Sequence, residues 1–208
     1  MTIAAWKNIA LSRLPGALPD VVQAELLEVI DEFCRRSTAW REMVYSLDIT
    51  AADRTVTPVI GAGTQAEVIG ILRVYYNQMR LTDYSHVPYE TTADNAAGYT
   101  AQSDSPGVIV LSTIPTVSQT GVIDALVYAK PVDATAYLPT VLTDQFYDYI
   151  LYGLLGRMYS HQSRPYTNDK LALAYTRQYT SAITTARSMA NRGFTGNAQN
   201  WTFPAFGR

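Results

Sequence analysis

The chain has 208 residues, enough for one large domain or two small ones, and its formal net charge of -2 argues against a broad basic surface for nucleic acid. A single cysteine, Cys34, excludes an internal disulfide, and the N-terminus lacks the basic stretch and apolar run of a secretory signal, so neither secretion nor membrane insertion is expected. Charged residues make up only 16% of the chain while tyrosine occurs 15 times, which favours either a subunit partly covered by neighbours or simply a weakly charged soluble domain.

The first part of the chain predicts one amphipathic helix. Residues 3–11 form a short mixed segment that ends before a proline–glycine breaker. A helix is predicted over residues 20–38, with Asp20 as its N-cap and Gln23 three positions later, as in a capping box. Cys34 lies near the apolar face, which predicts a buried structural thiol rather than a nucleophile. The apolar face contains Val22, Leu26, Ile30 and Phe33.

Over residues 40–132 the hydrophobic period changes from helical to alternating. Glycine, proline and asparagine separate several short apolar runs, a pattern typical of an antiparallel sheet or a small sandwich. Residues 82–105 are polar and predict a long loop or hairpin arm. The predicted strands cover residues 43–49, 68–76, 107–111 and 122–129.

The stretch 138–165 contains the predicted central helix of the fold, and His161 lies just past the end of this helix. Pro139 suits a first helical turn, and Thr140 is the predicted N-cap. Gly153 and Gly156 lower the helix propensity, which makes sense where another helix packs closely. The unbroken apolar run is too short to cross a bilayer. One face of this helix carries Leu142, Phe146, Ile150, Leu154 and Met158.

The last part of the chain predicts a third helix and a tail. The helix ends at Gly193, which is placed as its C′ residue. Residues 194–208 form a broken tail whose exposed aromatic side chains would be costly in water, so docking on a partner is expected, with folding back on the same subunit as the alternative. The predicted helical stripe is Leu171, Tyr175, Tyr179, Ala182, Ala186 and Met189, and the tail aromatics are Phe194, Trp201, Phe203 and Phe206.

These elements predict an α+β fold. Residues 1–40 and 133–193 are expected to form a bundle of three main helices. Residues 41–132 are expected to form a large antiparallel sheet or sandwich inserted between the first and second helix, and residues 194–208 an extended C-terminal tail.

One glycine-rich segment resembles a dinucleotide-binding fingerprint. Gly61, Gly63 and Ala66 match the pattern G-x-G-x-x-A. That motif must open a helix, so that the pyrophosphate meets the helix N-terminus, whereas residues 68–76 predict a strand. A turn between strands is therefore favoured over a cofactor site, and a nucleotide-binding enzyme that uses this loop is kept only as an alternative.

No other catalytic or metal-binding constellation is recognised in the sequence. His86 and His161 lack a carboxylate or cysteine at a metal-ligand spacing, and no nucleophile-elbow motif is present. Asp144 and Asp148 stand four positions apart and could pair as acids, although a solvated or interface face is the favoured interpretation. The chain is therefore not expected to be an enzyme, and no cofactor is expected.

Five segments in the helical regions stand out, in element order along most of the chain: residues 14–19, 32–40, 138–139, 149–155 and 164–169. Together they resemble the head-to-tail adaptor proteins of tailed bacteriophages, the group of tail tubular protein A-like connectors. The middle segment, about residues 53–120, carries no motif of this group.

The resemblance implies a structural protein of the virion, assembled in the host cytoplasm. Such adaptors form a homo-oligomeric ring, usually of twelve copies, between the portal protein and the tail tube or nozzle, and viral DNA passes through without sequence-specific binding. The candidate contacts with the portal or a neighbouring subunit are Phe194, Trp201, Phe203, Phe206 and Arg208. A monomeric tail-completion or other interaction protein is the further alternative, separated from a ring by stoichiometry.

Overall fold

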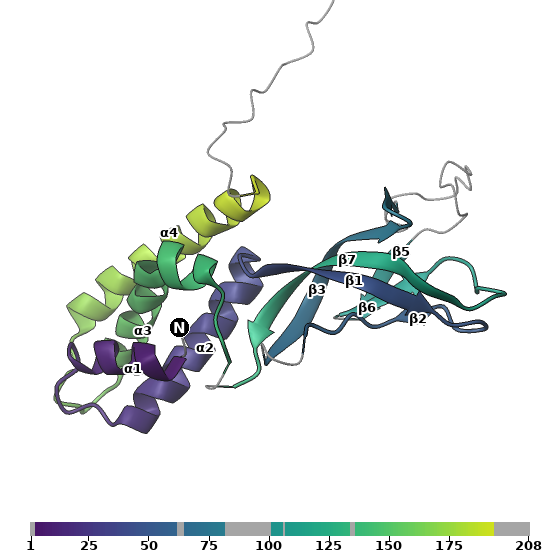
Figure 1. Ribbon diagram of the computed structural model, residues 1–208. Coiled ribbons are helices and arrows are strands. Elements are labelled where there is room, and N and C mark those ends of the chain that lie inside the picture. Colours follow the sequence, from purple (N-terminus) through teal and green to yellow (C-terminus); the bar gives the residue numbers. More distant parts are fainter. Residues whose placement is uncertain (1–2, 62–64, 82–100, 106, 134–135, 194–208) are drawn as a thin grey trace, which may run out of the picture.

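The computed structural model describes residues 3–61, 65–81, 101–105, 107–133 and 136–193 (Figure 1). The chain is an α+β protein with antiparallel sheets, as expected. None of the described helices combines the length and apolar character that a membrane span needs. In chain order the elements are α1 (Ile3–Leu11), α2 (Pro19–Ser37), β1 (Arg41–Ile49), β2 (Thr55–Val56), β3 (Ala66–Tyr76), β4 (Met79–Arg80), β5 (Ala101–Ser105), β6 (Val108–Leu111), β7 (Gln119–Pro131), the π-helical turn η2 (Val141–Gln145), α3 (Tyr147–Ser160) and α4 (Asp169–Asn191).

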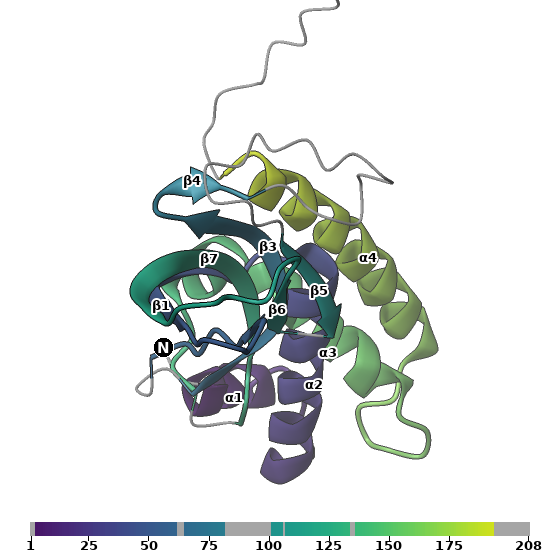
Figure 2. The ribbon, with the colours of Figure 1, turned by 90° about the vertical axis from the view of Figure 1, so that its right-hand side faces the viewer.

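The helices and the strands occupy different ends of the molecule. Helices α1 to α4 pack together at one end, and the strands extend away from them (Figures 1 and 2). We call these two groups the helical part and the β part. They meet where Arg41 of β1 donates to Asn191 of α4 at 2.9 Å, and where Lys130 of β7 lies 3.9 Å from Asp31 of α2.

Strand β7 lies at the centre of the larger sheet, whose order is β1-β7-β3-β4, with every neighbouring pair antiparallel. A smaller antiparallel sheet has the order β2-β6-β5. The four predicted strands are confirmed. A long loop or hairpin arm was predicted over residues 82–105. Residues 101–105 form β5 and pair antiparallel with β6, which agrees with the hairpin-arm alternative at this end; residues 82–100 lie outside the described residues. The buried face of β7 consists of Ile123, Ala125, Val127 and Ala129.

Helix α2 begins two residues earlier than the predicted N-cap Asp20 implies. Pro19 opens the helix, because proline lacks the N–H that a first turn leaves unpaired and its φ is already helical. The N-cap is Leu18, which makes no side-chain capping bond, so Asp20 as N-cap and the capping box with Gln23 were wrong predictions. Gln23 instead accepts a hydrogen bond from Lys7 of α1 at 2.9 Å.

Helix α1 is an element that the sequence interpretation missed, since residues 3–11 were expected only as a mixed segment. Ile3, Trp6 and Ala10 are all buried, and their spacing of three and four residues is that of one helical face. The helical spacing of apolar residues was therefore visible in the sequence, but only over a short segment. A helix of nine residues is marginal alone and depends on packing against its neighbours.

The central helix is interrupted, which corrects the prediction of one continuous helix. The chain forms η2 first, breaks at Phe146 and continues as α3, which ends at Ser160, so that His161 lies just past it as predicted. Thr140 occupies the N-cap position of η2, as predicted, but it has helical backbone angles and its side chain makes no capping bond. The predicted apolar row is nevertheless confirmed, because Leu142, Phe146, Ile150, Leu154 and Met158 are all fully buried.

The two glycines of α3 mark close helix contacts, as predicted. A Cβ atom at Gly153 would lie 2.7 Å from both Val29 of α2 and Tyr179 of α4. A Cβ atom at Gly156 would lie 2.9 Å from the hydroxyl of Thr176 on α4. No real Cβ approaches other atoms so closely, so these positions let three helices meet.

Helix α4 turns a somewhat different face to the core than predicted. Leu171 and Met189 are 39% exposed, whereas Ile183 and Ala190 are buried instead. Leu171 and Met189 stand 18 residues apart, which is five turns of a helix with 3.6 residues per turn, so both lie at the same edge of the buried face, which is centred nearer to Ile183 and Ala190. Gly193 follows the helix with φ of +69°, which confirms it as the C′ residue.

The connections α1–α2 and α3–α4 share one backbone hydrogen bond. In the first, the amide of Ala17 donates to the carbonyl of Leu14 at 3.0 Å; in the second, the amide of Thr167 donates to the carbonyl of Arg164 at 3.1 Å. Their backbones differ within the turn, since Gly16 has φ of +80°. The two connections touch, because a Cβ atom at Gly16 would lie 3.1 Å from the ring of Pro165. Residues 14–19 and 164–169 are therefore neighbours at one end of the helical part.

Candidate functional site

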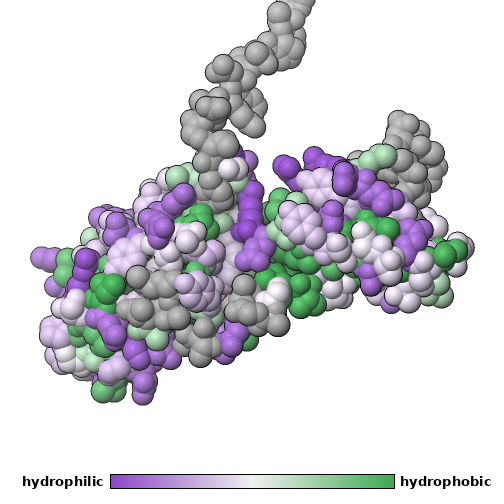
Figure 3. Space-filling model, viewed as in Figure 1, coloured by the Kyte–Doolittle hydropathy of each residue, from purple (hydrophilic) through white to green (hydrophobic). Residues whose placement is uncertain are grey.

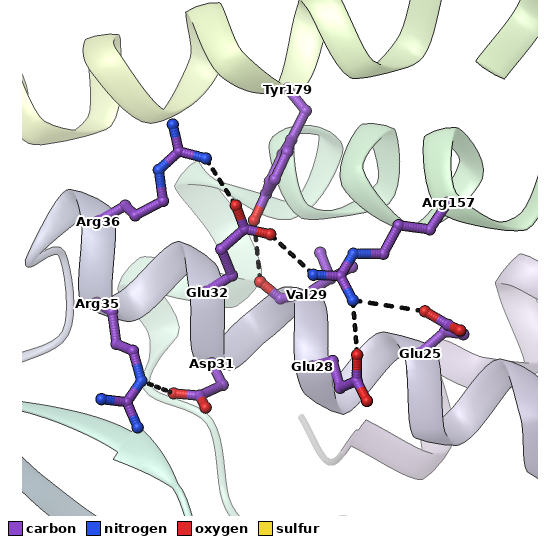
Figure 4. Close-up of polar contacts among 9 residues, drawn as sticks. All are labelled: Glu25, Glu28, Val29, Asp31, Glu32, Arg35, Arg36, Arg157 and Tyr179. Atoms are coloured by element: carbon purple, nitrogen blue, oxygen red, sulfur yellow. Dashed lines mark hydrogen bonds and ion pairs between the residues drawn. The ribbon is translucent and has the colours of Figure 1, made fainter. Parts of the chain in front are cut away.

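The most connected polar group of the helical part surrounds Arg157 (Figure 4). Glu25, Glu28 and Glu32 lie three and four residues apart, so they share one face of α2. Arg157 of α3 points into this row, with guanidinium–carboxylate distances of 3.5, 2.7 and 2.9 Å to Glu25, Glu28 and Glu32. Arg36 adds a second contact to Glu32 at 2.6 Å. The cluster ties α3 to α2.

The charge state of Glu32 follows from these contacts. Burial by itself would raise the pKa of Glu32, but the hydrogen bonds from Arg36 and Arg157 outweigh it and hold the pKa below its ordinary value. Beneath the cluster, the hydroxyl of Tyr179 donates to the carbonyl of Val29 at 3.0 Å. Burial raises the pKa of Tyr179, so this hydroxyl keeps its proton and remains a donor. The arrangement is that of a structural ion cluster over a helix contact.

We expect the substitution Glu32→Gln to destabilise the fold by about 1 kcal/mol at pH 7, since a half-buried charged pair contributes about that much. The folded-state pKa of Glu32 is depressed, so its charge stabilises the fold above the unfolded value of 4.5, and this stabilisation is lost as the pH falls through the folded pKa. Thermal unfolding between about pH 7 and about pH 3 should therefore show a smaller acid-induced loss in the variant than in the wild type.

The matched control for this measurement is Glu67→Gln. Glu67 is an exposed carboxylate of β3 with one contact, to Lys130 at 3.2 Å. The Glu67→Gln variant should lose almost as much thermal stability on acidification as the wild type does. Equal acid sensitivity of Glu32→Gln and the wild type would show that the charge of Glu32 does not stabilise the fold.

His161 has one carboxylate neighbour that its sequence spacing did not indicate. Its Nε2 atom lies 3.2 Å from Glu25, a residue 136 positions away in the chain. Among the described residues no group of three or more histidine, cysteine or acidic side chains could hold a metal ion. Ser160 donates its hydroxyl to the backbone carbonyl of Arg157 at 2.6 Å, so it is not aligned with His161 as a nucleophile. The other histidine, His86, lies outside the described residues.

The remaining candidate groups lack reactive surroundings. Cys34 is fully buried, as predicted, and burial together with the nearby Asp31 carboxylate raises the pKa of its thiol, which disfavours the reactive thiolate. Downstream of Gly61, the chain enters β3 at Ala66 and pairs antiparallel with β7. The described chain after the glycine segment is thus a strand, as expected, and not the helix that a dinucleotide fingerprint requires; residues 62–64 lie outside the described residues.

Tyrosine side chains form a half-buried stack between α3 and α4. The ring of Tyr175 lies between those of Tyr152 and Tyr159, with centroid distances of 5.9 and 5.8 Å and interplanar angles of 26° and 21°. Stacked, packed rings lose little conformational freedom on binding, which is why tyrosine is common at interaction surfaces. The sequence did not predict this stack, although its many tyrosines had favoured a subunit whose surface is partly covered by neighbours.

Exposed apolar side chains occur on both parts of the molecule. In Figure 3 hydrophobic surface is visible on the β part where it faces the helical part. The predicted contact residues of the tail, residues 194–208, lie outside the described residues. The exposed large apolar side chains of the described chain are Ile9, Leu18, Tyr45, Val59, Met79, Ile114, Val117, Val132, Tyr137, Leu171, Leu173 and Met189.

The sequence matches no protein-family model and none of the curated proteins with which it was compared.

Proposed function

We propose that this chain is a structural protein of a tailed-phage virion, a head-to-tail adaptor. Twelve copies would form a ring between the portal protein and the tail tube or nozzle, and viral DNA would pass through it. In this proposal, residues 1–40 and 133–193 are the helical bundle and residues 41–132 the β-rich insertion. The protein has a scaffolding role and no catalytic one.

The proposal rests on the position in the fold of the residues that resemble the adaptor proteins. Residues 14–19 and 164–169, which carry part of the resemblance, form the two helix connections that touch at Gly16 and Pro165. The resembling residues of α3 include Gly153, at which three helices meet. Segments far apart in the sequence thus belong to one structural unit, which supports a shared fold rather than chance similarity.

The surface of the chain also supports a subunit with neighbours. A single exposed apolar residue needs no explanation, but here such residues occur on α1, α4, the strands and the connections. The low charge content of 16% makes such surfaces less costly to bury. Rings close through head-to-tail contacts, in which two different faces of each copy are covered.

The decisive measurement is the mass of the purified chain by light scattering, alone and mixed with the portal protein encoded in the same genome. We expect a ring-sized assembly, either spontaneously or on addition of the portal, instead of the 23.0 kDa of one subunit. A one-to-one complex with the portal subunit, without contacts between copies of this chain, would favour a monomeric tail-completion protein. A 23.0 kDa species that ignores the portal would overturn the adaptor proposal.

A further inference from the structure

Strand β1 has one backbone edge without a partner strand. It lies at one end of the larger sheet and pairs with β7 on one side only. Of the four strands at the ends of the two sheets it is the longest, with nine residues against five in β5 and two each in β2 and β4. Such an edge is a template for another strand, and proteins usually cover it.

The hydrogen-bond pattern of β1 shows which of its backbone groups face β7. The amide of Ala129 donates to the carbonyl of Trp40 at 3.0 Å, just before β1 begins. Directly opposed residues of an antiparallel pair alternate between bonded and non-bonded, so Glu42 and Val44 bond to β7. The register is regular up to Val44 and shifts between Val44 and Leu47, so this alternation holds over the first half of the strand.

The alternate residues, Arg41 and Met43, turn their amides and carbonyls away from β7. Within the part of the chain that the structure describes, no group forms a hydrogen bond with these two donors and two acceptors. The side chain of Met43 is half-buried, and Tyr45, two residues further on, is 68% exposed. The edge therefore combines open hydrogen-bonding groups with apolar side chains, which is what an added strand requires.

Helix α4 ends beside the start of this edge. The guanidinium of Arg41 donates to the side-chain oxygen of Asn191, the last residue of α4, at 2.9 Å. Figure 1 shows the end of α4 and the start of β1 where the helical part meets the β part. Residues 194–208 therefore follow α4 next to the first residue of β1. A link of residues 194–200 spans up to about 23 Å, far more than the gap that one arginine side chain bridges.

The tail sequence contains one run that favours a strand. Trp201, Thr202 and Phe203 are aromatic or β-branched, and no other three consecutive residues of 194–208 share this preference. Pro204 ends the run, because proline cannot donate to a ladder. Trp201 and Phe203 stand two positions apart, so in an extended strand both side chains lie on one face.

We propose that residues 201–203 add as a strand to the free edge of β1 of their own chain, with Trp201 and Phe203 packed on the face that carries Met43. Methionine sulfur and aromatic rings make favourable contacts. A tethered segment reaches its site at an effective concentration on the order of millimolar, which favours the same chain over another copy. This assigns the folding back that the sequence left open to one surface, and it applies to the subunit whether or not a ring forms.

Hydrogen exchange resolved to single amides tests the proposal. We expect the amides of Arg41 and Met43 to exchange at least about tenfold more slowly in the full chain than in a chain that ends at Gly193. The amides of Glu42 and Val44 bond to β7 and should exchange equally in both chains. Their unchanged exchange also shows that the chain without residues 194–208 keeps its fold.

Two variants of the full chain test the tail residues themselves. Trp201→Ala with Phe203→Ala removes the packing on β1 and should raise the exchange of the two outward amides to the rate of the chain without the tail. The matched control, Phe194→Ala with Phe206→Ala, removes two rings outside the strand-favouring run and should exchange like the wild type.

Equal exchange of the Arg41 and Met43 amides with and without residues 194–208 would overturn the proposal. A mixture of the unlabelled full chain with an isotope-labelled chain that ends at Gly193 distinguishes the chain's own tail from that of another copy. The outward amides of the labelled chain should stay unprotected in this mixture. Protection there would show that the tail pairs with a neighbouring copy, which overturns the assignment to its own chain.

Discussion

Replacing Phe33 with alanine is expected to lower the free energy of unfolding by about 3–5 kcal/mol. Phe33 of α2 is fully buried, with ring centroids 5.5 Å from Phe146 and 6.4 Å from Tyr179. The three rings come from α2, from the break before α3 and from α4. Alanine would remove the contacts of one ring and leave a cavity between three elements that cannot all move inward.

Chemical denaturation followed by circular dichroism measures this change directly. Tyr45→Ala is the control, because Tyr45 is 68% exposed on β1 and its loss should change the stability by no more than about 0.5 kcal/mol. Phe33→Leu keeps most of the volume and should cost less than about 1.5 kcal/mol. A loss below about 1 kcal/mol in Phe33→Ala would contradict the packing of these three rings.

Gly153→Val is expected to destabilise the protein by about 1–3 kcal/mol, with larger losses if the helices separate. Helix propensity alone predicts the opposite sign, because valine is favoured over glycine inside a helix by a few tenths of a kcal/mol. The expected loss therefore requires that the steric overlap of the valine side chain with its neighbours outweighs this gain in helix propensity. A Cβ at this position meets Val29 and Tyr179 at 2.7 Å, and neither can retreat without disturbing α2 or α4.

The control for this variant is Ala174→Val on the exposed side of α4. It introduces the same β-branched side chain into a helix without a neighbour to clash with, and should cost only the difference in propensity, about 0.6 kcal/mol. Both variants are compared by thermal and chemical unfolding. A Gly153→Val protein as stable as the wild type would show that α2, α3 and α4 do not meet at this residue.

The sequence was informative where burial repeats with the period of one element. The row from Leu142 to Met158, the apolar face of α2 and the alternation in β7 were all visible, because each residue reports which side of its own helix or strand is covered. The two glycines of α3 even indicated a close neighbour. In such places the pattern within a few residues is enough to predict the element and its buried face.

The sequence was misleading where short-range chemistry competes with packing. Asp20 and Thr140 are good capping residues, yet Pro19 opens α2 without a side-chain cap, and the chain around Thr140 forms a wide turn. The break at Phe146 places this residue and Leu142 together in the core. Capping bonds contribute about 1 kcal/mol, less than the burial of two large side chains.

By itself, the sequence determined the α+β composition, the main strands, most of α2 and the buried state of Cys34. Only the tertiary structure decided which partners lie across each face: Arg157 over the glutamates of α2, and His161 beside Glu25. It also brought the two helix connections together and put α1 opposite α4 (Figure 2). The physical reason is that the spacing of apolar residues along one helix or strand predicts which of its side chains are buried. It does not predict which residues cover them, because those residues belong to chain segments more than a hundred residues away.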